Sequence, residues 1–179
     1  TPVKMEYNAI VHCRKGRVLM EMGGKEQIKV GAGQLLLVPA RKLFQPMMVS
    51  TDVDAAALLV SDRLMKSVLG PQIDIWNRAM YLHETYVINT QRWSDALNSH
   101  AHSVFKDHSL VLYREFVLSS LRIFLLIICE ELLHLAPAPT EGKSASTERE
   151  KLLFNEFLDM LQHEQLKRRQ VNYYAERLC

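Results

Sequence analysis

The sequence predicts an α+β protein that begins as a small β-barrel and continues as helices. Three observations support this prediction. Apolar and polar residues alternate over residues 3–60, the period becomes helical from Ser61 onward, and a Pro- and Ser-rich stretch precedes a final helical part. We therefore expect a barrel over 1–60, a helical region over 61–136, a linker over 137–146 and a second unit over 147–179.

Short alternating runs predict the strands of the barrel. Gly23 and Gly24 stand between two such runs, and because glycine accepts the positive φ of a tight turn, the pair predicts a β-hairpin. Several short strands separated by turns are typical of a sandwich or barrel. The expected strands cover residues 3–12, 18–22, 25–30, 34–38, 44–49 and 53–60.

Helical periodicity marks residues 61–136. Ser61 is a good N-cap for the first helix, and Gly70 followed by Pro71 ends it. The last helix of this region is apolar on most of its sides, which exceeds what one domain can cover and predicts a homodimer. The further helices are expected at 73–80, about 89–106 and about 110–135, with a short extended piece around residues 86–88 before the second of them. The expected dimer contacts are Leu118, Leu121, Leu125, Ile128 and Leu132.

Composition excludes several classes of function. The 22 Lys and Arg against 20 Asp and Glu leave a net charge of +2, which does not by itself indicate a polyanion-binding surface. Cys13, Cys129 and Cys179 lie far apart, without a CxxC pattern, and predict neither a disulfide framework nor a zinc site. No apolar stretch approaches the roughly 18 residues that span a bilayer. We expect a cytoplasmic protein that is not inserted into a membrane.

Methionine and aromatic residues supply the candidate effector site. Methionine side chains either shape an adaptable apolar pocket, because the thioether is flexible, or simply fill the core. The aromatic candidates either contact a ligand or pack in the core, and the histidine either hydrogen-bonds a ligand or faces water. The candidate effector-binding residues are Tyr7, His12, Met20, Met22, Met48 and Trp76.

Catalytic and metal-binding patterns are absent from the sequence. His100, His102 and His108 are close in sequence, but helical residues two apart lie about 200° apart and cannot meet one ion. We find no Ser-His-Asp or Cys-His arrangement and no paired carboxylates on a strand. We therefore expect no catalytic residues, no metal and no cofactor.

The C-terminal residues resemble a known DNA-binding family. The pattern L-F-x-x-F-L-x-x-L over 153–161 precedes a basic run at 167–169 and a helical pattern at 171–178. Over about 30 residues this resembles the start of the DNA-binding domain of the AraC family. The resemblance implies that 171–178 is the first helix of a helix-turn-helix and that the recognition helix lies beyond Cys179. DNA reading is therefore expected of the full-length protein only.

Basic residues of this segment are candidate contacts to the DNA backbone. The same residues also suit a solvated helix end, because positive charge is favourable at a helix C-terminus. The candidates are Lys167, Arg168, Arg169 and Arg177.

The upstream residues fit the layout of the same family. The run over 31–39 resembles the family's small cupin-like barrel, which is followed by helices that dimerise. Catalytic cupins carry His and Glu metal ligands where this chain has Val18, Met20, Met22 and Leu43. We interpret the chain as the effector-sensing and dimerisation part of a ligand-responsive transcription regulator. The alternatives are a cupin-type barrel enzyme and an interaction module without a DNA role.

Overall fold

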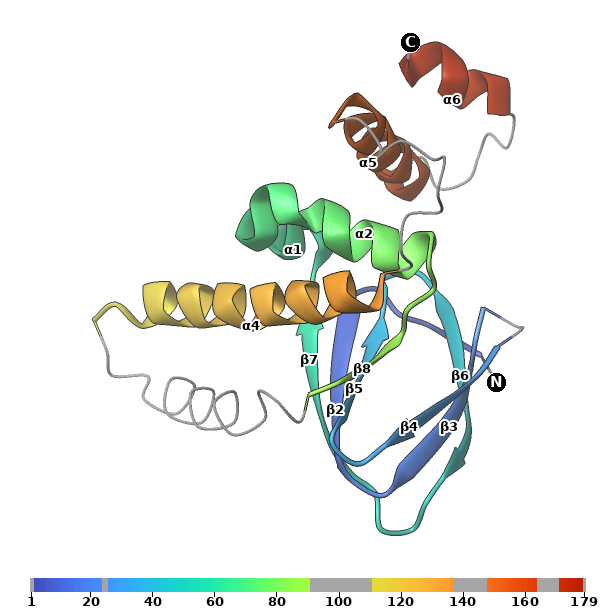
Figure 1. The fold of residues 1–179 in the computed structure, drawn as a ribbon, viewed down its shortest axis with the longest axis vertical. Helices are drawn as coiled ribbons and strands as arrows, with labels where there is room; N and C mark the ends of the chain where they lie inside the picture. Colours follow the sequence, from blue (N-terminus) through green and yellow to red (C-terminus); the bar gives the residue numbers. More distant parts are fainter. Residues whose placement is uncertain (1, 24–25, 91–110, 137–147, 164–170, 179) are drawn as a thin grey trace. The chain divides into compact units, whose positions relative to one another are not determined.

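The computed structural model describes residues 2–23, 26–90, 111–136, 148–163 and 171–178. The chain divides into two compact units, residues 1–136 and 137–179, and the division falls at the first residue of the predicted linker. The linker itself lies outside the described residues, as do residues 91–106 of the predicted helix and His100, His102 and His108. Figure 1 shows the described strands and helices of each unit.

The strands of the first unit form two four-stranded antiparallel sheets, called sheet A and sheet B. Sheet A has the order β1 (Val3–Lys4), β6 (Leu43–Val49), β3 (Arg17–Met22), β4 (Glu26–Gly31). Sheet B has the order β7 (Asp54–Val60), β2 (Asn8–Lys15), β5 (Gln34–Val38), β8 (Val87–Asn89). The prediction of a barrel is therefore corrected, because among the described strands the sheets are not hydrogen-bonded to each other into a closed wall. The strand β8 corresponds to the short extended piece that the sequence predicts around residues 86–88.

Tight turns set the register of the strands. The predicted hairpin is confirmed, since Val18 pairs with Val30 across β3 and β4, and Gly23 has a φ of +63°. The turn between β2 and β3 requires Gly16, whose φ is +82° and whose added Cβ would lie 2.5 Å from the Ser50 Oγ. The amide of Arg17 donates to that same Oγ at 2.9 Å. The turn from β2 to β3 is thereby held against the turn from β6 to β7.

Three helices cover one face of sheet B. They are α1 (Asp62–Leu69), α2 (Ile73–Tyr81) and α4 (Tyr113–Leu135), with the 3₁₀ turn η1 (Gly70–Gln72) between the first two. The predicted cap is confirmed, because the Ser61 Oγ accepts from the Leu64 amide at 3.2 Å. Helix α4 contacts α1, α2 and β8 (Figure 1). Residues 35–38 of β5 are all buried, since one face of this strand meets sheet A and the other meets the helices.

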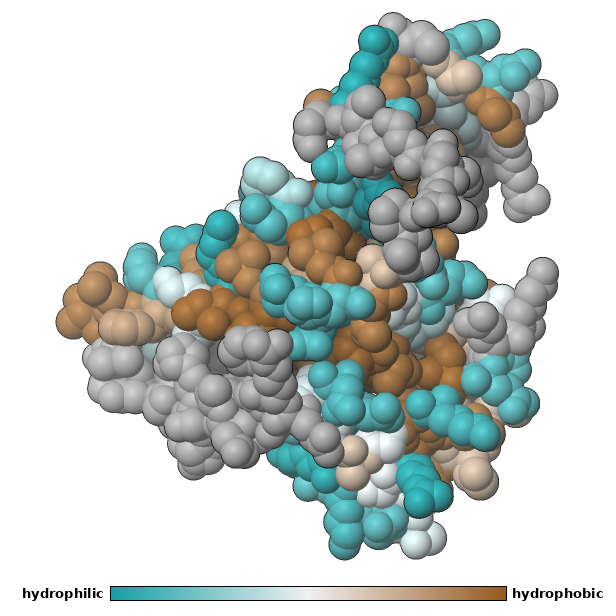
Figure 2. All heavy atoms as spheres, in the orientation of Figure 1, coloured by the Kyte–Doolittle hydropathy of each residue, from teal (hydrophilic) through white to brown (hydrophobic). Residues whose placement is uncertain are grey.

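The predicted dimer contacts lie on the wrong face of α4. Leu121, Leu125, Ile128 and Leu132 are buried in the chain's own core, and Leu118 packs against the same core. These side chains recur every three or four residues and so form the face that covers α1, α2 and sheet B. The exposed apolar residues of the helix are others, and Figure 2 shows hydrophobic side chains along α4 at the surface.

The second unit contains α5 (Glu148–His163) and α6 (Val171–Leu178). The rings of Phe157 and Tyr174 meet edge to face with centroids 5.6 Å apart, and Tyr174 is buried. Arg177 is exposed and donates to the Tyr173 hydroxyl at 2.6 Å. The other three predicted DNA-backbone residues lie outside the described part of the chain. None of the described helices combines the length and hydrophobicity that crossing a bilayer requires.

A buried asparagine joins β2 to the start of the helical layer. The Asn8 Nδ2 donates to the Val60 carbonyl at 3.3 Å and to the Asp62 Oδ1 at 2.7 Å. Its Oδ1 accepts from the Ala40 amide at 3.0 Å. One side chain thereby satisfies backbone groups at the end of β7 and after β5, and it fixes the point where β7 passes into α1.

We predict that Asn8→Ala lowers the free energy of unfolding by about 2–3 kcal/mol, because it leaves a buried amide and a buried carbonyl without partners. Urea unfolding measures the loss. The matched control is Gln27→Ala, which removes an exposed amide side chain from β4 and should change stability by less than about 0.5 kcal/mol. Equal effects of the two variants would contradict the role assigned to Asn8.

Candidate effector site

An apolar cavity of about 150 Å³ lies between the two sheets. Sheet B contributes side chains from β2, β5 and β7, and sheet A contributes side chains from β3, β4 and β6. Alternation along the strands explains this lining, since every second side chain of a strand faces the opposite sheet. The residues that define the walls include Ala9, Val11, Met20, Phe44, Ala57 and Leu59.

Small side chains on β7 create the space. The strand contains three consecutive alanines, of which Ala55 and Ala57 line the cavity. A methyl group reaches less far toward sheet A than the β-branched or aromatic side chains that strands usually carry. In the described structure β7 pairs with β2 alone and is an edge strand. Ala55, Ala57 and Leu59 are exposed, so the cavity opens to solvent along this edge.

Only one of the six predicted effector residues lines the cavity. Met20 is buried in its wall. Met22 and Trp76 are buried elsewhere in the core, and Tyr7 is 49% exposed. His12 lies between two cavity-lining residues of β2, so alternation places its side chain on the other face of the strand. Burial and the nearby Arg14 lower the pKa of this histidine.

The prediction for Met48 fails because of a β-bulge. The pairing of β3 with β6 shifts between Leu19 and Met20, so that Leu19 lies opposite Met48 and Met20 lies opposite Pro46. The extra residue reverses the alternation of β6 at this point. Leu19 lies between two cavity-lining residues and shares the outer face of sheet A with Met48, which is 65% exposed.

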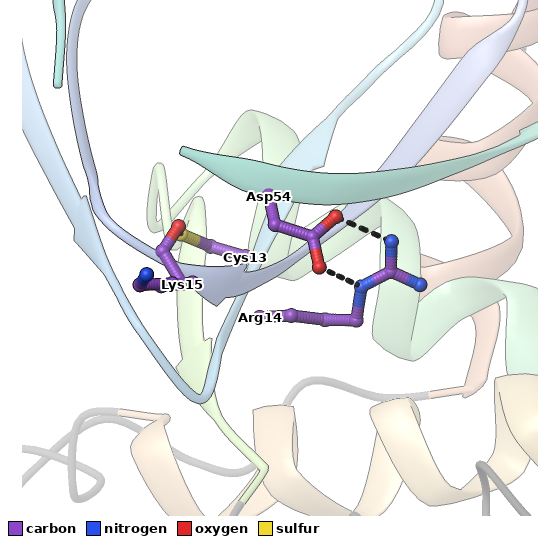
Figure 3. Close-up of polar contacts among 4 residues, drawn as sticks. All are labelled: Cys13, Arg14, Lys15 and Asp54. Atoms are coloured by element: carbon purple, nitrogen blue, oxygen red, sulfur yellow. Dashed lines mark hydrogen bonds and ion pairs between the residues drawn. The ribbon is translucent and has the colours of Figure 1, made fainter. Parts of the chain in front are cut away.

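An ion pair joins the open edge to β2 (Figure 3). The Arg14 Nε donates to Asp54 Oδ2 at 2.9 Å, and Nη2 donates to Oδ1 at 2.5 Å. These bonds hold the pKa of Asp54 below its ordinary value. The pair ties the first residue of β7 to the end of β2, next to the cavity-lining Cys13 and Ala55.

The cysteine of the cavity wall lies in an environment that disfavours its thiolate form. The Cys13 Sγ donates to the Lys15 carbonyl at 3.4 Å and lies 3.6 Å from the Gly16 carbonyl. Burial raises the pKa of this thiol, and burial raises that of Cys129 to about 12. Both cysteines are free, while Cys179 lies outside the described residues. Since a thiolate is the nucleophilic form, neither environment favours nucleophilic chemistry.

A second polar cluster lies at the turns that follow β5 and α2. The Lys42 Nζ donates to Glu84 Oε1 at 3.0 Å and to the Tyr86 hydroxyl at 2.5 Å. Burial opposes the charge of Lys42, but the two bonds outweigh it and raise its pKa. The bond from Lys42 lowers the pKa of Glu84. The cluster fastens two turns together, and none of its members lines the cavity.

We predict a small acid-dependent loss of stability from this cluster. Because the folded state lowers the pKa of Glu84 below 4.5, its contribution is present above that pH and is lost as pH falls through the folded value. The Glu84 side chain is 51% exposed, so the contribution is about 0.5 kcal/mol. Urea unfolding at pH 6 and pH 3 gives the free energy of unfolding lost on acidification. This loss should be smaller by about 0.5 kcal/mol in Glu84→Gln than in the wild type. An identical loss in both proteins would contradict the assignment.

We also predict that Met20→Ala lowers the free energy of unfolding by about 2–4 kcal/mol, because it enlarges the cavity and removes buried apolar area. Met48→Ala deletes the same atoms from an exposed site and should cost less than about 0.5 kcal/mol. Thermal or urea unfolding of the pair tests the placement of the two methionines on opposite faces of sheet A.

The described residues provide no cluster of three or more His, Cys, Asp and Glu side chains that would hold a metal ion. The site is thus an apolar cavity between two antiparallel sheets, in a unit whose helical layer continues along the chain into a separate helical unit. Apolar concave interiors are the usual places where proteins bind small molecules.

Comparisons with known proteins identify the fold. No protein-family model matches the sequence, and no curated protein matches it. Among solved structures, the AraC-like transcriptional activator CuxR is similar, with a TM-score of 0.53 at 12% identity over 97% of this chain and 57% of that one. Apo ToxT from Vibrio cholerae gives a TM-score of 0.51 at 11% identity over 98% of this chain and 64% of that one. The chain has the fold of AraC-like transcriptional activators, as the C-terminal motif predicts, and spans about three-fifths of these two chains.

Proposed function

We propose that this chain is the effector-sensing and dimerisation part of a DNA-binding transcription regulator. The observation that carries the proposal is the cavity between the two sheets, found in a fold that the chain shares with AraC-like activators. In this proposal a small molecule enters along β7, and DNA binding belongs to the whole protein. A barrel enzyme is less well supported, because the lining side chains include no acid, base or activated nucleophile.

The surface of α4 supports a homodimer. Residues at alternating spacings of four and three along the helix form one stripe, and its apolar members at the surface include Phe116 and Ile123, each about half exposed. Spacing that averages 3.5 residues is the pattern with which two helices pack as a coiled coil. The proposed interface consists of Leu112, Phe116, Ser119, Ile123, Leu126, Glu130 and Leu133, of which Leu126 also packs against the chain's own core. A second copy of the same helix is the proposed partner.

The second unit supports the DNA-binding part of the proposal. Its two helices pack through Phe157 and Tyr174, while Leu152 and Val171 remain largely exposed. Exposed apolar side chains on so small a unit favour packing against further helices. Arg177 lies on the surface of α6, where it could meet a phosphate.

We predict that Ile123→Glu converts the dimer to a monomer, because the change buries a charge against an apolar partner and weakens association at least 100-fold. Arg114→Glu is the matched control, since nine residues turn a helix by about 180° and place Arg114 on the opposite side of α4. Sedimentation of the chain and its two variants measures the association. A wild-type monomer at high concentration contradicts the proposed interface.

Selection of genomic DNA fragments by the full-length gene product tests the function itself. Wild type and Arg114→Glu should recover the same discrete sites, and Ile123→Glu should recover them at least tenfold less well, because it loses one half of the contacts. Recovery of no discrete site by the wild type would show that the protein is not a regulator. Equal recovery by Ile123→Glu would overturn the α4 interface and leave the regulator assignment standing.

A further inference from the structure

We infer that the cavity takes an uncharged, apolar molecule whose buried part is about the size of one aromatic ring. The inference rests on the proposed function, because it assumes that this cavity is the effector site. It adds the chemical class of the ligand, which the fold does not supply, since the fold alone does not determine what a pocket binds.

The lining defines the chemical class. All of the lining side chains belong to Ala, Val, Leu, Met, Phe or Cys. The one polar hydrogen among them, on Cys13, is donated to the Lys15 carbonyl. Strands β2, β3 and β5 are each paired on both sides, so their backbone amides and carbonyls point to neighbouring strands and not into the cavity. A hydroxyl or carboxylate placed there would lose its hydration and gain no hydrogen bond.

Charged groups near the cavity do not change this conclusion. The nearest ion pair in sequence is Arg14 with Asp54, and these residues satisfy each other with two hydrogen bonds. Asp54 precedes the lining residue Ala55 on β7, so alternation places its side chain, with the Arg14 bound to it, on the outer face of sheet B, and neither residue lines the cavity. A ligand carboxylate or ammonium inside the cavity would therefore meet no counter-ion from this pair.

The volume of the cavity and its opening along β7 define the size of the ligand. An apolar protein cavity of about 150 Å³ accommodates benzene, which sets the buried part at roughly one ring or a short branched alkyl group. The exposed edge at Ala55, Ala57 and Leu59 gives such a molecule a path from solvent.

A series of three ring compounds tests the class. Toluene, phenol and benzoate differ by one substituent on the same ring, and each is titrated into the full chain with labelled methyl groups while NMR spectra are recorded. We expect toluene to shift the methyl signals of Val11, Val18 and Leu36 saturably and to leave those of Leu125 and Leu132 in place. Phenol should bind at least tenfold more weakly, and benzoate should cause no shift of the lining signals.

Two variants of β7 locate the binding. Ala57→Phe fills the cavity and should abolish the toluene shifts, whereas Ala56→Phe adds the same ring to the other face of the strand and should retain them. If Ala57→Phe does not fold, Ala57→Val narrows the same space with a residue that suits strands and should weaken toluene binding several-fold. Retention of full affinity by a folded Ala57 variant would overturn the proposed location.

The remaining outcomes separate this inference from the proposed function. Absence of any toluene shift up to its solubility in water overturns the inference. Binding of phenol or benzoate as tight as that of toluene, and sensitive to Ala57→Phe, overturns the apolar class but keeps the cavity as an effector site. Recovery of genomic sites by the full-length protein, measured separately, decides whether the regulator assignment survives either result.

Discussion

Burial of β5 on both faces is the constraint on which the rest of the first unit depends. Residues 35–38 of β5 are four consecutive buried apolar residues, so this strand needs a covering layer on each side. Sheet A supplies one layer and thereby encloses the cavity. Helices α1, α2 and α4 supply the other, and α4 uses its face at Leu121, Leu125 and Ile128 to do so. The stripe of α4 that remains exposed is what this packing leaves over.

Local signals in the sequence predict much of this fold. The hairpin at Gly23, the helix that Ser61 caps and the long apolar helix α4 all follow from turn chemistry, capping and periodicity. These features depend on residues within a few positions of each other, so one segment contains the information. The failure to close the barrel is different, because it depends on which distant strands pair. The bulge that turns Met48 outward is likewise a property of two strands together.

The faces of α4 and the walls of the cavity could not be predicted in the same way. When a helix is apolar on most of its sides, its sequence pattern does not show which side faces the core. The pattern therefore favoured Leu125 and Ile128 as dimer contacts, although both face the core. For the site, the sequence pattern favoured large flexible side chains such as Met22 as ligand contacts, whereas the space is created by the small side chains of Ala55 and Ala57. The run of alanines in the predicted strand was the one sequence signal for this space. It does not predict a cavity by itself, because a cavity also depends on which side chains of sheet A face the alanines.

The alanines of β7 have a consequence for how the cavity changes in evolution. Methyl groups at positions 55 and 57 set the volume of the cavity and make no hydrogen bond. Exchanging them for valine or glycine alters the space by a few atoms without leaving a polar group unpaired, and β7 keeps its backbone bonds to β2. Single substitutions on one strand can therefore change which molecules fit between the two sheets, while the helices that pack on sheet B stay unchanged.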